Sequence, residues 1–207
     1  MSTVDDRRYM DLALALARAQ QGRTAPNPAV GCVLVKTGRI LATGSTRDGG
    51  RPHAERVALD RAGDAANGAT AYVTLEPCAH HGQTPPCAQG LIDAGITRVV
   101  IACRDEFPHV AGKGVAMLQA AAIATEIGPG RADAHALYAG FFQRLETGLP
   151  QVRVDDRAHG YDAELRAETI EAAEEELKAH GRAGVNRICI APDHPLAGRN
   201  WLPALPD

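Results

Sequence analysis

Short strand-like runs and longer helix-like segments alternate through the middle of this sequence, and the alternation restricts the folds open to it. The apolar runs and the amphipathic segments that follow them occupy, in turn, residues 71–75, 87–94, 98–103, 114–121, 124–127 and 132–145. Gly95 and Gly128 interrupt the pattern where breaks are needed. Such alternation predicts an α/β fold with a largely parallel sheet and helices on both faces.

The first third of the chain predicts a helix, a hairpin and a second helix. Apolar positions recur on one helical face between residues 5 and 20. Two β-rich runs at 29–35 and 40–44 flank a Thr-Gly turn, which is typical of a hairpin. A further helical pattern covers 54–61.

Composition shifts near residue 150 and divides the chain unequally. With 207 residues and 45% apolar residues, the chain is long enough for one well-packed domain at 1–150. The remaining segment, 151–207, is short for an independent core, and we expect it to be an extension. Within it we predict one exposed helix at 171–180, one strand at 184–190 and an irregular tail.

Charge and cysteine content exclude several classes of function. The net charge is −3 with both signs interspersed, which gives no electrostatic reason to expect a nucleic-acid partner. No apolar stretch reaches membrane length, and the N-terminus lacks a basic start followed by an apolar run. We therefore expect a cytoplasmic protein with no membrane partner. Its five cysteines do not predict a disulfide framework, which leaves metal binding to be considered.

Three side chains have the chemistry and the placement of a zinc site. A catalytic zinc takes three nitrogen or sulfur ligands and keeps one position for water. His53 lies at a predicted loop-to-helix junction, Cys78 follows a predicted strand, and Cys87 begins the next predicted helix. The ends of strands in α/β sheets are where such sites form. His53, Cys78 and Cys87 are therefore our predicted zinc ligands.

Glu55 is placed to act as the proton carrier of the same site. It follows His53 by two residues, on the first turn of the predicted helix. Zinc lowers the pKa of water from about 15.7 to roughly 7, and a nearby carboxylate can then take up and return a proton. A His-x-Glu followed by Pro-Cys…Cys is typical of zinc-dependent nucleobase deaminases, although the usual gap between the cysteines is two residues. Here it is eight.

The contents of that longer gap point to a known family. The stretches VTLEPCAHHGQTPPC, TAPNPAVGCVLV, RPHAERVAL and AGKG resemble the deaminase domain of bacterial riboflavin-biosynthesis proteins, from about Tyr9 to Pro150. The resemblance implies a cytidine-deaminase-like three-layer α/β/α fold with a short C-terminal extension. It also implies Zn²⁺-dependent hydrolytic deamination of diaminohydroxyphosphoribosylaminopyrimidine, with ammonia released, and a homo-oligomer.

The same resemblance implies roles for individual residues. His53, Cys78 and Cys87 correspond to the zinc ligands and Glu55 to the proton shuttle. The small-molecule substrate would be bound by residues in the matched motifs or beside them: Asn27, His80, Gln83, Thr84 and Asp105. Some of these have structural alternatives, because an Asn between two prolines can cap a turn and a Thr before prolines can cap a helix.

Departures from the family pattern concern the sugar phosphate and leave the zinc residues unchanged. The family usually has His at Thr46, Lys or Arg at Gln83, and Asn at Phe107. One alternative is therefore the same chemistry on an unphosphorylated aminopyrimidine, nucleoside or pterin-like ring. Cations that could compensate are Arg47, Arg51, Arg104 and Lys113.

Two further alternatives involve the zinc and the extension. A fourth ligand from His80 or His81 would make the zinc site structural. A catalytically silent zinc module could instead act beside a separate reductase, since the family often joins its deaminase to one. Residues 151–207 are too short for that reductase and lack an expected glycine pair, so we interpret them as a degenerate remnant without a nicotinamide site.

Overall fold

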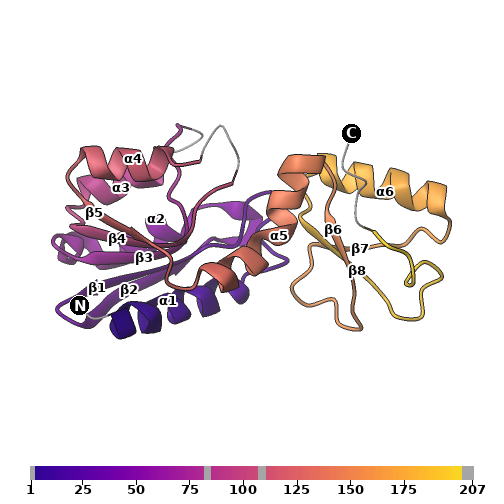
Figure 1. The fold of residues 1–207 in the computed structure, drawn as a ribbon, viewed down its shortest axis with the longest axis horizontal. Coiled ribbons are helices and arrows are strands. Elements are labelled where there is room, and N and C mark those ends of the chain that lie inside the picture. Colours follow the sequence, from indigo (N-terminus) through magenta and orange to yellow (C-terminus); the bar gives the residue numbers. More distant parts are fainter. Residues whose placement is uncertain (1–2, 82–84, 107–110, 202–207) are drawn as a thin grey trace.

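The computed structural model describes residues 3–81, 85–106 and 111–201, which form two α/β units on either side of one long helix (Figure 1). The helices are α1 (Thr3–Arg18), α2 (Ala54–Ala62), α3 (Cys87–Asp93), α4 (Lys113–Ala120), α5 (Arg131–Thr147) and α6 (Ile170–Arg182). The strands are β1 (Gly31–Lys36), β2 (Arg39–Ser45), β3 (Thr70–Leu75), β4 (Arg98–Cys103), β5 (Ala124–Ile127), β6 (Gln151–Val154), β7 (Ala163–Glu164) and β8 (Arg187–Ile190). Short 3-10 turns lie at Asp48–Gly50 and Gly63–Ala66.

The larger unit is a sheet with the order β2-β1-β3-β4-β5, covered by helices on both faces. Strands β3, β4 and β5 pair in parallel, whereas β1 is antiparallel to both β2 and β3. Four strands therefore share one direction and β1 alone is reversed. The reversal follows from the turn between β1 and β2, where Thr37 and Gly38 have φ values of 50° and 77°. The predicted three-layer α/β/α fold is confirmed.

Close packing of small residues lets the helices lie flat on this sheet. A Cβ atom added to Gly31 of β1 would lie 1.9 Å from the carbonyl oxygen of Ala13 in α1, so only glycine fits there. The fully buried core is built around the strands and includes Met10, Leu14, Tyr72, Leu91, Ile101 and Leu118. Within the described ranges, no helix combines the length and the apolar composition needed to cross a membrane.

One buried ionic network fastens α1 to the sheet. Asp6 is 2% exposed and accepts hydrogen bonds from both Nη atoms of Arg98, at 2.7 and 2.8 Å, and from the hydroxyl of Tyr72 at 2.7 Å. The Arg98 guanidinium is the main reason that the pKa of Asp6 lies below its usual value. A second carboxylate, Glu126 of β5, also accepts from Arg98.

The smaller unit corrects our expectation of a single strand after residue 150. It is a parallel sheet with the order β6-β8-β7, and α6 packs on it. It also has an apolar cluster of its own, formed by Leu165, Ala173, Leu177, Ile188 and Ile190. Strand β6 alternates polar and apolar residues over only four positions, and β7 has only two residues, so neither pattern is long enough to predict a strand. Both strands pair with the buried strand β8.

Candidate active site

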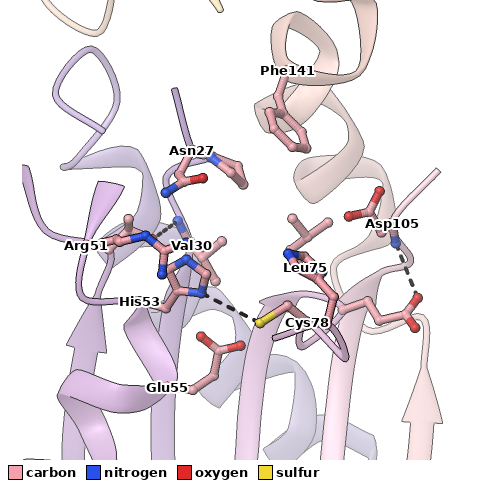
Figure 2. A pocket seen from close by; sticks show the side chains of 13 residues that line it. Asn27, Val30, Arg51, His53, Glu55, Leu75, Cys78, Asp105 and Phe141 are labelled. Atoms are coloured by element: carbon pink, nitrogen blue, oxygen red, sulfur yellow. Dashed lines mark hydrogen bonds between the residues drawn. The ribbon is translucent and has the colours of Figure 1, made fainter. Parts of the chain in front are cut away.

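The predicted zinc ligands meet where strand β3 ends and helices α2 and α3 begin (Figure 2). His53 immediately precedes α2, in extended conformation with φ −68° and ψ 159°. Cys78 follows the end of β3 by three residues, and Cys87 is the first residue of α3. Three separate elements thus bring one imidazole and two thiols together.

The distances between these side chains suit one metal ion. His53 Nδ1 lies 3.3 Å from Cys87 Sγ and 3.9 Å from Cys78 Sγ. The potential ligand atoms all lie within 4.8 Å of one another. His80 and His81 do not join the group, so the described residues offer zinc three ligands and no fourth. This donor set is that of an open, catalytic zinc site.

The start of α3 favours the thiolate that metal binding requires. The backbone N–H of Cys87 donates to Cys78 Sγ at 3.3 Å. The hydrogen bond from the Cys87 thiol and that from His53 lower the pKa of Cys78 to about 4, against the opposing effect of burial. Because zinc coordinates thiolates, this arrangement prepares the site for the cation.

Glu55 lies beside the three ligands without belonging to them. It is 4% exposed, on the first turn of α2, and Figure 2 shows its carboxylate directed towards the His53 ring and the Cys78 sulfur. Burial raises the pKa of the Glu55 carboxyl to about 7, and the charge of Cys78 adds to the rise. A carboxyl with such a pKa can both accept and donate a proton near neutral pH.

A cavity of about 120 Å³ opens onto this group. Its wall is formed by Asn27, Pro28, Val30, Thr46, Arg51, His53, Glu55, Leu75, Glu76, Cys78, His80, Asp105 and Phe141. Three of our predicted substrate-binding residues, Asn27, His80 and Asp105, are therefore in the wall. The other two, Gln83 and Thr84, lie outside the described residues, as does Phe107.

The cavity has one candidate for recognising an anion. Among the described residues of its wall, Arg51 is the one arginine or lysine; Arg47, Arg104 and Lys113 do not line it. Thr46, where the family usually has histidine, is 1% exposed, and its hydroxyl accepts from the backbone N–H of Val30 at 3.0 Å. Thr46 is thus engaged in holding the start of β1.

Sequence reasoning assigned no role to Phe141 or to Glu76, although both line the cavity. Phe141 comes from α5 and faces the site from the side opposite the zinc ligands (Figure 2). The chain has only three phenylalanines, so the Phe-Phe pair on a long predicted helix was the signal available. Only the packing of α5 shows which of the two faces the cavity.

Glu76 organises the other side of the cavity. It is 6% exposed and accepts hydrogen bonds from the backbone N–H groups of Gly112 and Val115, both at 3.1 Å, and more weakly from that of Asp105 at 3.4 Å. One carboxylate therefore connects the end of β3 to the segment after β4 and to the start of α4. The backbone of its neighbour Pro77 lies so close to Gly114 of α4 that a Cβ atom added to Gly114 would be 2.0 Å from the Pro77 carbonyl oxygen.

Comparison with known proteins places this site among the zinc deaminases. Residues 3–103 match the family model of the cytidine and deoxycytidylate deaminase zinc-binding region. The riboflavin biosynthesis protein RibD of Haemophilus influenzae is 52% identical over 146 residues, which cover 70% of this chain and 39% of that protein. A diaminohydroxyphosphoribosylamino-pyrimidine deaminase of Buchnera aphidicola subsp. Schizaphis graminum is 45% identical over 145 residues, which cover 70% of this chain and 99% of that protein.

Solved structures agree in fold. A diaminohydroxyphosphoribosylaminopyrimidine deaminase/5-amino-6-(5-phosphoribosylamino)uracil reductase from Thermotoga maritima superimposes with a TM-score of 0.79 at 25% identity. The match covers 91% of this chain and 81% of that one, and so extends into the smaller unit. The chain spans about two fifths of the length of the RibD proteins that it matches.

Proposed function

This chain belongs to the diaminohydroxyphosphoribosylaminopyrimidine deaminase family, and on that premise we propose that it hydrolyses the amino group from the pyrimidine ring of that substrate and releases ammonia. The observation that carries the proposal is the convergence of His53, Cys78 and Cys87 within 4.8 Å, with Glu55 buried beside them. Riboflavin biosynthesis is the pathway in which relatives of the chain are named.

The proposed reaction assigns one task to each group. His53, Cys78 and Cys87 would hold the zinc, which when bound would make a water molecule reactive near neutral pH. The water oxygen bonds to the amino-bearing ring carbon, and the carbon–nitrogen bond to the amino group breaks. Glu55 takes a proton from the water and passes it to the amino nitrogen, which leaves as ammonia. Because Glu55 is buried, its proton stays at the reacting atoms.

We assign recognition of the ring to the walls of the cavity. The Asn27 Nδ2 group donates to the carbonyl of Gly50 at 3.0 Å, and Figure 2 shows the Asn27 side-chain oxygen on the cavity side. That oxygen can accept from a ring N–H. Phe141 offers an apolar face across the cavity, which suits a flat heterocycle. His80 and Asp105 supply further polar contacts at the rim.

We further propose that Arg51 binds the phosphate of the substrate. It is the cation that the described wall of the cavity offers, whereas Thr46 has an uncharged hydroxyl that is already bonded. A guanidinium pairs with a phosphate through charge-assisted hydrogen bonds. Arg51 would therefore replace the cations that the family usually has elsewhere.

Ammonia release from the phosphorylated substrate and from its dephosphorylated form, on protein of measured zinc content, tests these assignments. We expect turnover of both and a preference for the phosphorylated form. Arg51→Ala should reduce that preference roughly 10- to 100-fold, the effect of losing a hydrogen bond to a charged group. Arg47→Ala, outside the cavity wall, is the matched control and should not change it.

Each alternative has its own outcome in the same experiment. Turnover of the dephosphorylated ring alone would mean that the substrate is unphosphorylated. No turnover of either form, with one zinc bound per chain, would mean a silent zinc module. Ammonia release that persists after complete removal of zinc would contradict the mechanism itself.

We also propose partners and an origin for the smaller unit. Its parallel sheet and the overlap with the Thermotoga maritima protein support a relationship to the reductase part of that protein. We expect that residues 151–207 bind no nicotinamide cofactor. We also expect that a separate reductase acts on the product and that the chain forms a homo-oligomer. NADPH binding to the purified chain, measured by calorimetry, would contradict the first expectation, and light scattering checks the last.

A further inference from the structure

The loop that carries Asn27 and Pro28 into the cavity has no regular secondary structure of its own. It runs from Thr24 to Pro28, between α1 and β1. Within the loop, Thr24 Oγ1 donates to the Asn27 carbonyl, and the Asn27 N–H donates to the Thr24 carbonyl, both at 3.0 Å. These bonds fix the shape of the turn. The position of the turn relative to the zinc ligands depends on what it contacts from outside.

Arg144 is the outside contact that joins the loop to the smaller unit. This half-buried residue of α5 donates through Nη2 to the carbonyl of Pro26 at 2.9 Å. Through Nε it donates to Asn186 Oδ1 at 2.7 Å, just before β8. Its guanidinium also lies 5.7 Å from the centre of the Phe141 ring, which lines the cavity on the side opposite the zinc ligands. One side chain thus contacts the loop, the smaller unit and the aromatic wall.

Backbone packing reinforces this connection from the smaller unit. Gly184, two residues before Asn186, has φ +85°, and a Cβ added there would lie 2.3 Å from Pro26 Cβ. Two residues before the loop, a Cβ added to Gly22 would lie 2.4 Å from the carbonyl oxygen of Tyr161. The middle of the loop, at Pro26, and the residue that leads into it, Gly22, therefore both lie directly against the smaller unit.

We propose that the smaller unit contributes to substrate binding at the deaminase site. Arg144, Asn186 and Gly184 hold the Thr24–Pro28 loop in the position at which Asn27 contacts the substrate ring. Arg144 and Asn186 act here as positioning residues and touch neither zinc nor substrate. Because Asn27 is assigned to binding of the ring and not to the reacting atoms, its displacement weakens binding equally before and in the transition state, which raises KM and leaves kcat nearly unchanged. The zinc ligands come from elements that these residues do not contact.

The test uses the full chain with two variants, Asn186→Ala and Arg144→Ala, which break the same connection from opposite sides. We expect KM for the proposed substrate to rise about tenfold in each, while kcat changes less than about twofold and zinc stays at one per chain. Arg199→Ala is the matched control, since that arginine bonds Glu174 on the smaller unit's own surface. It should leave both constants unchanged.

The kinetic measurements depend on the proposed deamination being correct. Hydrogen exchange of the backbone amides of residues 22–30 needs no substrate and therefore tests the inference independently. Exchange in this segment should accelerate in Asn186→Ala although the substitution lies in the other unit, and remain unchanged in Arg199→Ala. Unchanged exchange and unchanged KM in both Arg144→Ala and Asn186→Ala would overturn the proposal. A fall in zinc content that parallels a fall in kcat would also overturn it, since the contact would then only support the fold.

Discussion

The backbone N–H of Cys87 donates to the sulfur of Cys78 across 3.3 Å, although eight residues separate the two cysteines. The first turn of α3 thus fixes the spacing of the sulfurs, whatever path the chain takes between them. Removing either sulfur should therefore greatly weaken zinc binding without disturbing the sheet.

Cys87→Ala is expected to purify with far less than one zinc per chain, because two ligands bind zinc much more weakly than three. Elemental analysis of the purified protein measures this directly. Cys103→Ala is the matched control, since that buried thiol lies outside the metal group. Equal zinc contents in the two variants would show that Cys87 is not a ligand.

Glu55→Gln should retain zinc and lose turnover. The amide keeps the size of the side chain but cannot carry a proton, so we expect kcat to fall by roughly 10²- to 10⁴-fold. Zinc content and ammonia release are measured on the same preparation. Asp60→Asn, on the same helix but paired with Arg56 at the surface, should have the activity of the unsubstituted chain. Activity in Glu55→Gln near that of the unsubstituted chain would remove Glu55 from the mechanism.

Glu76→Gln should loosen the segment between β4 and α4. The N–H groups of Gly112 and Val115 donate to different oxygens of the carboxylate, and the amide keeps only one oxygen, so its NH2 group would face one of these two donors and leave it without an acceptor. We expect a loss of about 1–3 kcal/mol in the free energy of unfolding, measured with urea. Glu164→Gln, exposed on β7, is a control that should change little. An unchanged unfolding midpoint for Glu76→Gln would show that these bonds contribute no net stability.

The Asp6–Arg98 pair predicts a loss of stability at acid pH. The pKa of Asp6 is lowered in the folded chain, chiefly by Arg98, so the unfolded chain binds the proton more tightly. The stabilisation is therefore complete above the ordinary pKa of aspartate, about 3.9, and disappears as pH falls through the lower, folded value.

Asp6→Asn should remove this contribution. At pH 7 we expect it to cost about 2 kcal/mol in unfolding free energy, and the difference from the unsubstituted chain should shrink as pH falls below about 4. Urea unfolding between pH 3 and pH 7 measures this difference. Asp11→Asn, which breaks an exposed pair with Arg7, should cost little at any pH. A difference for Asp6→Asn that stays constant with pH would refute the assignment.

Much of the larger unit was predictable because its patterns are local. The strands at 98–103 and 124–127 have the bounds that the sequence indicated, since the first is a β-branched apolar run shortly after Gly95 and the second ends at Gly128. The metal group was predictable for a chemical reason, because His and Cys at those spacings have few other uses. Phe141 was not, since its place in the cavity depends on how α5 crosses the sheet. Strands β6 and β7 were missed because four and two residues are too few for a strand pattern to stand out.

The reversed direction of β1 determines which parts of the chain can share one site. Because β1 runs against β3, the residues that enter β1 lie level with those that leave β3, as the hydrogen bond from the N–H of Gly31 to Thr74 Oγ1 shows. The segment before β1 brings Asn27, and the segment after β3 brings Cys78. A ring bound there would contact the segment that enters one strand, while its amino group is removed at the end of another. The register of β1 against β3 therefore sets the position of Asn27 relative to Cys78, and a shift of that register would separate binding of the ring from its chemistry.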